Sequence, residues 1–190
     1  MPKTSSRTPP IRTREVEGIR YPFHSYVPET LKSRHIILFG HGSIISPDIV
    51  EKTARMFTSF TRDFDTYGLA ALMPVLPRKE NVKSKEYLDA QILERAVMIE
   101  DCDPYYARPD KEILKMISFY QKELREDGHD ISDLVYVSGV SAGGTMANRM
   151  AVLYPDIIAA SATFISGIFM YPETKIDDIS LPYPFGVSDI

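Results

Sequence analysis

One serine of this sequence lies in a pattern that can make it a nucleophile. Gly139-Val140-Ser141-Ala142-Gly143 is a G-x-S-x-G motif between an apolar run and an amphipathic run. On a sharp strand-to-helix turn, such a serine projects from the carboxyl end of the sheet, beside helix N–H groups that stabilise negative charge. Strand and helix must pass closely there, so Gly139 and Gly143 fit, and Gly144 extends the motif. The alternative is a glycine-rich turn with an incidental serine.

A second motif, Phe39-Gly40-His41-Gly42-Ser43, follows an earlier apolar run. Its backbone N–H groups at Gly42 and Ser43, with that of Ala142, are predicted to form an oxyanion hole. Loss of one such donor typically costs about 10²–10³ in rate. His41 is expected to shape this turn, with a role as substitute base as the alternative.

Apolar runs alternate with amphipathic runs, and this alternation predicts the elements that position both motifs. We expect an α/β fold with a mostly parallel sheet and helices on both faces. Residues 1–18 are predicted to be a flexible tail, and residues 19–190 a single domain. The expected strands are one or two exposed antiparallel ones in 19–28, buried ones at 35–39, 69–73 and 134–137, and a fourth of the alternating series at 162–165. The expected helices begin at Ser46-Pro47, near Tyr87, at Pro109 and at Gly143.

Composition excludes several classes of protein. The net charge of -4 and the pI near 5.6 leave no basic footprint for nucleic acid. Cys102 is the only cysteine, so it can form neither an intramolecular disulfide nor a cysteine metal cluster. No apolar run reaches the ~20 residues that span a membrane, and the polar N-terminus lacks a secretory h-region. We expect a cytoplasmic protein with no metal, no nucleic-acid partner and no membrane contact.

The segment GVSAGGTMANRMAVLYPDIIAASATFISG resembles the elbow of the polyhydroxybutyrate-depolymerase and feruloyl-esterase-like branch of the α/β-hydrolases. Upstream, IILFGHGS resembles the apolar strand and the His-Gly oxyanion turn of that branch. The resemblance covers about residues 35–167, with a gap between 77 and 108. It implies a carboxylic-ester hydrolase that acts on a small-molecule ester, often an aryl ester or polyester, without a cofactor. Ser141 is then the nucleophile, and the N–H groups of Ala142 and Ser43 are the oxyanion donors.

The sequence departs from that family in its catalytic acid and base. The family order is serine, then acid, then histidine, yet all four histidines (His24, His35, His41 and His129) precede Ser141. His35 and His129 are expected at the opposite sheet edge, ~20 Å from Ser141 at ~3.3 Å per residue. Asp177, Asp178 and Asp189 follow the elbow, but prolines there predict loop rather than the strands that the family would place next.

Two interpretations remain open at this point. The sequence is either a truncated α/β-hydrolase that lacks the last strands, to be completed by a C-terminal segment or chain, or an inactive hydrolase-fold protein. The exposed edge that a shortened sheet would leave favours truncation. In either case we expect little or no activity from these 190 residues alone. The alternative functions are an oligopeptidase-like hydrolase and a non-catalytic binding protein.

Overall fold

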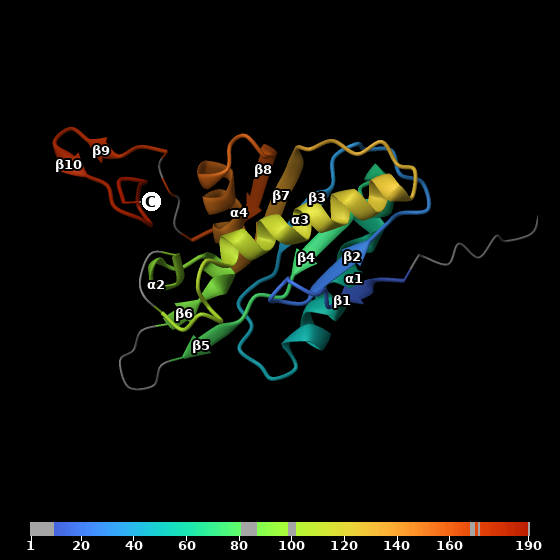
Figure 1. The fold of residues 1–190 in the computed structure, drawn as a ribbon, viewed down its shortest axis with the longest axis horizontal. Helices are drawn as coiled ribbons and strands as arrows, with labels where there is room; N and C mark the ends of the chain where they lie inside the picture. The colour runs from blue at the N-terminus through green and yellow to red at the C-terminus, as the bar shows by residue number, and fades with distance from the viewer. Residues whose placement is uncertain (1–9, 81–86, 99–101, 168–169, 171, 190) are drawn as a thin grey trace, which may run out of the picture.

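A six-stranded sheet forms the centre of the molecule in the computed structural model, which describes residues 10–80, 87–98, 102–167, 170 and 172–189 (Figure 1). The strand order is β1-β2-β4-β3-β7-β8. Neighbouring strands β4, β3, β7 and β8 run parallel, whereas β1 and β2 are antiparallel additions at one side. The strands are β1 (Arg12–Arg14), β2 (Phe23–Tyr26), β3 (Ile37–Gly40), β4 (Ala71–Pro74), β7 (Val135–Val140) and β8 (Ile158–Phe164).

Helices cover both faces of this sheet and create two cores. On one face, α1 (Ile49–Tyr67) packs Phe57 and Phe64 against Phe39 of β3. On the other face, α3 (Pro109–Glu126) and α4 (Ala142–Leu153) pack Ile117 and Met146 among buried strand residues. Figure 1 shows α3 crossing in front of the sheet, with α1 behind it. Burial on both faces explains why the central strands are continuous apolar runs rather than alternating ones.

The order of the strands fixes where a ligand can bind. From β3 the chain crosses by α1 to β4 on one side, and it then returns by α3 to β7 on the other side of β3. Right-handed crossovers therefore put α1 and α3 on opposite faces, and the carboxyl ends of β3 and β7 form the topological switch point at which open α/β sheets generally bind ligands. His41 follows β3 and Ser141 follows β7, so this topology confirms the predicted α/β arrangement and brings the two motifs to one edge.

Several predicted elements differ from the observed ones. Among the described residues, regular structure begins at Arg12, within the predicted tail of residues 1–18, because β1 pairs with β2 and Arg14 binds Glu123 at 2.6 Å. Residues 1–9 of that predicted tail lie outside the described residues. β2 is fully buried rather than exposed, since its side chains lie between the helices of both faces. α1 begins after Asp48, two residues beyond the predicted Ser46-Pro47 start.

The segments before α3 and after β8 also differ from prediction. In place of one helix near Tyr87, the chain forms β6 (Tyr87–Asp89), the 3-10 turn η1 (Ala90–Ile92) and α2 (Arg95–Met98), with β5 (Arg78–Glu80) paired to β6. After β8, a small hairpin of β9 (Lys175–Ile176) and β10 (Ile179–Ser180) replaces the expected loop. No helix among the described residues is both long and apolar enough to cross a membrane.

Candidate active site

Ser141 occupies the turn between β7 and α4 in a backbone conformation that few side chains adopt. Its φ is 55° and its ψ is -117°, a region that costs an L-residue about 1–3 kcal/mol and that clusters at functional sites. The N–H of Ser141 donates to the carbonyl of Phe164 on β8 at 2.9 Å, which anchors the turn to the sheet. Ser141 itself is exposed, and its hydroxyl does not cap α4. The sequence prediction of a sharp strand-to-helix turn at this serine is therefore confirmed in its geometry.

Three glycines let the two motifs approach each other. A Cβ on Gly143 would lie 2.1 Å from the carbonyl carbon of Gly40, and one on Gly139 would lie 2.4 Å from the carbonyl carbon of Gly143. Real Cβ atoms do not come this close to other heavy atoms, so no side chain fits at these positions. The prediction that positions 139 and 143 require glycine is confirmed. Position 40 requires glycine for the same reason, because a Cβ there would lie 2.6 Å from the Cα of Gly143. At Gly144 the nearest atom is 3.1 Å away, a tight but less demanding contact.

The oxyanion turn, residues 41–44, lies beside Ser141. Gly40 pairs with Gly139 in the parallel register of β3 and β7, so the residues that follow each strand meet at the same edge. A Cβ built on Gly42 would be 3.9 Å from the Cβ of Ser141. The N–H groups of Ser43 and Ala142 make no hydrogen bond to any of the described residues. Two free donors thus flank the serine, and their role as oxyanion donors remains a prediction.

His41 is buried and structural. Its ring is 2% exposed; Nδ1 lies 2.7 Å from the carbonyl oxygen of Gly42, and Nε2 lies 3.2 Å from the N–H of Leu76. The Leu76 donor requires a lone pair on Nε2, so Nδ1 carries the proton and donates it to Gly42. Burial lowers the pKa of His41 to about 4, which keeps the ring neutral. Both ring nitrogens are occupied and neither contacts Ser141, so this geometry favours the turn-shaping role of His41 over the alternative of a substitute base.

The other histidines are equally engaged or remote. His24 is fully buried between Thr13 and Thr53, at 3.0 and 2.8 Å, and burial lowers its pKa to about 4. His35 contacts the carbonyl of Leu134 at 2.9 Å, at the start of β7 and hence at the opposite edge from Ser141. His129 lies in the connection from α3 to the start of β7. None of the four histidines hydrogen-bonds Ser141.

No carboxylate that follows the elbow is paired with a histidine. Asp177 and Asp178 lie exposed in the β9–β10 hairpin. Asp189 binds Arg95 at 2.7 Å and accepts from the N–H of Tyr183, and these bonds hold its pKa below its usual range. These three residues therefore do not form an acid–base pair in this structure.

One side chain at this site carried no signal in the sequence. Gln91 of η1 is 1% exposed and hydrogen-bonds both polar backbone groups of Ile44. The two residues are 47 positions apart, and no motif links them. Only the tertiary structure, which brings η1 against the turn after β3, reveals this contact.

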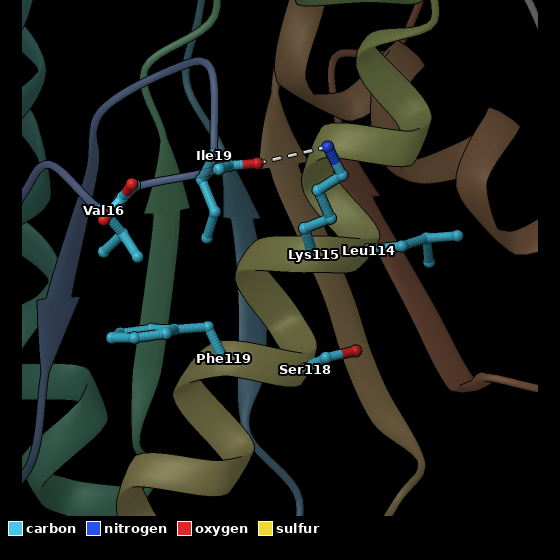
Figure 2. Close-up of a pocket in the computed structure, with 8 residues that line it drawn as sticks. Val16, Ile19, Leu114, Lys115, Ser118 and Phe119 are labelled. Atoms are coloured by element: carbon cyan, nitrogen blue, oxygen red, sulfur yellow. Dashed lines mark hydrogen bonds between the residues drawn. The ribbon is translucent and has the colours of Figure 1, made fainter.

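An apolar hollow of about 450 Å³ lies elsewhere, between residues 16–19 and α3 (Figure 2). Its walls include Val16, Ile19, Leu114 and Phe119, and Lys115 closes one rim by donating to the carbonyl of Gly18 at 3.2 Å. None of its lining residues belongs to the serine turn or to the oxyanion turn. The hollow is therefore separate from the site around Ser141. Among the described residues, no cluster of His, Cys, Asp and Glu could hold a metal ion.

Comparison with solved structures identifies the fold. The chain is similar to poly(aspartic acid) hydrolase-1 from Sphingomonas sp. KT-1, with 18% identity over 95% of this chain and 63% of that one, at a TM-score of 0.58. The thermostable metagenomic carboxylesterase EstE1 gives 16% identity over 89% of this chain and 51% of that one, with a TM-score of 0.54. An acetyl xylan esterase from Aspergillus awamori gives 18% identity over 90% of this chain and 58% of that one, with a TM-score of 0.52.

These likenesses show that the chain has an α/β-hydrolase-type fold, which confirms the fold class predicted from the sequence. The chain spans between about half and two thirds of the length of each of these structures. No protein-family model and no curated protein matches the chain. Because the identities are below one fifth, these comparisons establish the fold but not the activity, which has to be inferred from the site itself.

Proposed function

We propose that this chain carries the nucleophile half of a serine carboxylic-ester hydrolase. Ser141 attacks the ester carbonyl carbon, and the N–H groups of Ala142 and Ser43 stabilise the oxyanion that forms. The observation that carries this proposal is the exposed hydroxyl at a φ of 55°, at the start of α4 and beside the two free donors. The similarity to hydrolases and esterases supports it, as does the resemblance of the elbow to the aryl-ester and polyester branch.

The base that activates Ser141 must be a group other than the four histidines of this chain. A serine hydroxyl attacks efficiently only when a base takes its proton, and removal of the histidine from a triad costs about 10⁶ in kcat. The proposal therefore includes a further segment or partner chain that brings an acid and a histidine to Ser141. For the 190 residues alone we expect no measurable turnover of an aryl ester that depends on Ser141.

Stoichiometric labelling tests the nucleophile without requiring turnover. An alkyl fluorophosphonate reacts when the Ser141 oxygen forms a bond to phosphorus, fluoride leaves and the serine proton passes to solvent. We expect one slow label at Ser141, located by mass spectrometry, and none in Ser141→Ala. Imidazole added as an external base should accelerate the label, because the site has donors for the oxyanion but no base of its own.

A non-catalytic binding protein is the second candidate, and the absence of a histidine at Ser141 favours it. That candidate predicts no label at Ser141, with or without imidazole. A peptidase on the same fold is distinguished by paired ester and amide substrates once an acid and a base are supplied.

A further inference from the structure

We propose that η1 links the serine turn to the oxyanion turn and that Gln91 is the positioning residue that fixes the Ser43 N–H relative to Ser141. This inference rests on the proposed function and concerns how its two donors are held together. It starts from a buried amide that the reaction itself does not use.

Gln91 contacts the oxyanion turn as a neighbouring strand would. Its Nε2 donates to the carbonyl of Ile44 at 2.7 Å, and its Oε1 accepts from the N–H of Ile44 at 3.0 Å. An amide side chain that satisfies both polar groups of one residue fixes its position and its orientation. Ile44 directly follows Ser43, so the Gln91 amide fixes the peptides on either side of Ile44, the first of which starts at the carbonyl of Ser43 and adjoins the peptide that carries the proposed donor.

Gln91 is itself held by its own segment. Its backbone N–H donates to Asp89 Oδ1 at 2.9 Å, and the other carboxylate oxygen of Asp89 lies 2.9 Å from Arg78 Nε. Asp89 is 2% exposed, and burial raises its pKa although the Arg78 guanidinium opposes this. The Gln91 side chain therefore extends from a turn that is held in place by Asp89, the residue that caps its start.

The other end of η1 is attached to α4, the helix that directly follows Ser141. Arg149 of α4 is 1% exposed, and its Nη1 donates to the carbonyls of Ile92 and Leu93, the latter at 2.9 Å. The hydroxyl of Tyr183 donates to the same Leu93 carbonyl, and the Arg149 guanidinium lies 5.3 Å from the centre of the Tyr183 ring. η1 is thus bonded to α4 at one end and to the oxyanion turn at the other.

The oxyanion turn is consequently held from two sides. Its first residue, His41, is bonded to Leu76, which follows β4. Its last residue, Ile44, is bonded to Gln91 of η1 and through η1 to α4. The Ser43 N–H lies between these two attachments. Without Gln91, the His41 attachment and β3 would remain, but the far half of the turn would lose both hydrogen bonds that orient it.

Gln91→Met tests the link, because methionine has a similar length and neither polar group. Gln121→Met is the matched control: Gln121 is another buried amide, 6% exposed, whose Nε2 donates to the carbonyls of Ser132 and Asp133 far from Ser141. Gln91→Glu keeps the acceptor for Ile44 and covers the case in which Gln91→Met does not fold. Two readouts are measured in each variant, amide hydrogen exchange of residues 42–46 and the rate of Ser141 labelling by an alkyl fluorophosphonate.

We expect exchange in residues 42–46 to rise about tenfold in Gln91→Met, from the loss of two hydrogen bonds. Labelling should slow by about 10²-fold, the cost of a displacement near 1 Å. In Gln91→Glu, both the exchange rate and the labelling rate should lie between those of the wild type and those of Gln91→Met. In Gln121→Met, both should stay at wild-type values. Unchanged exchange in Gln91→Met, or equal slowing of the label in Gln121→Met, would overturn the proposal. Absence of any label in the wild type would end the proposed function, while exchange would still decide whether Gln91 holds the turn.

Discussion

The tight crossing of Gly143 of α4 and Gly40 of β3 predicts a large effect of a single methyl group. In Gly143→Ala the new Cβ would begin 2.1 Å from the carbonyl carbon of Gly40, whereas carbon atoms in contact are separated by ~3.5–4.0 Å. The gap must therefore open by more than about 1 Å. Overpacking that side chains can absorb costs about 1–3 kcal/mol.

Here the opposing atoms are backbone, and Gly40 is fixed by its pairing with Gly139 in the sheet. We therefore expect the free energy of unfolding to fall by at least about 3 kcal/mol, a large part of the ~5–15 kcal/mol of a typical domain. Urea denaturation of Gly143→Ala measures this loss. Gly42→Ala is the control, because its Cβ would meet nothing closer than 3.8 Å, and its cost should stay within about 0.5 kcal/mol. A loss below about 1 kcal/mol in Gly143→Ala, or equal losses in both variants, would refute the tight crossing of helix and strand.

Other predictions concern the strained serine and the buried histidines. Ser141→Gly should stabilise the fold by about 1 kcal/mol, or ~2–4 °C in Tm, because glycine adopts this conformation without strain; a melting temperature no higher than that of Ser141→Ala would contradict it. His24 and His41 are neutral in the folded state down to a pKa of about 4, whereas in the unfolded chain they protonate near 6.5. The unfolded state thus binds more protons between these values, so stability should fall as the pH falls, by up to about 3 kcal/mol per histidine. The free energy of unfolding, measured with urea at several pH values in this range, should depend less steeply on pH in His24→Gln than in the wild type. An equally steep dependence on pH would mean that His24 titrates normally.

The sequence predicts well those parts whose signals are local. The serine turn is recognisable because Gly139, Ser141 and Gly143 stand at alternate positions of one short motif between an apolar strand and a helix. The close contact of strand and helix excludes side chains larger than that of glycine at positions 139 and 143. The role of His41 also follows from its place after β3. The central strands follow from apolar runs, because burial on both faces requires them.

The parts that sequence reasoning missed depend on contacts between distant residues. Arg12–Arg14 forms a strand only because β2 offers an edge and Glu123 a partner for Arg14. The segment before α3 has no strong period. Its turns are held by Asp89, Gln91 and Arg149, and the hydrogen-bond partners of the Gln91 and Arg149 side chains lie 47 residues or more away in the sequence. Local propensity carries no information about such pairings.

The rate of Ser141 phosphonylation as a function of pH tests the central claim most directly. A serine served by a histidine base gives a rate that levels off above about pH 7, whereas a serine without one should react faster with each pH unit up to about pH 9. We predict a single label on Ser141 whose rate rises throughout this range without a plateau. A plateau with a midpoint near the histidine pKa would show that a base is present, and the absence of a label at Ser141 at every pH would contradict the assignment of the nucleophile.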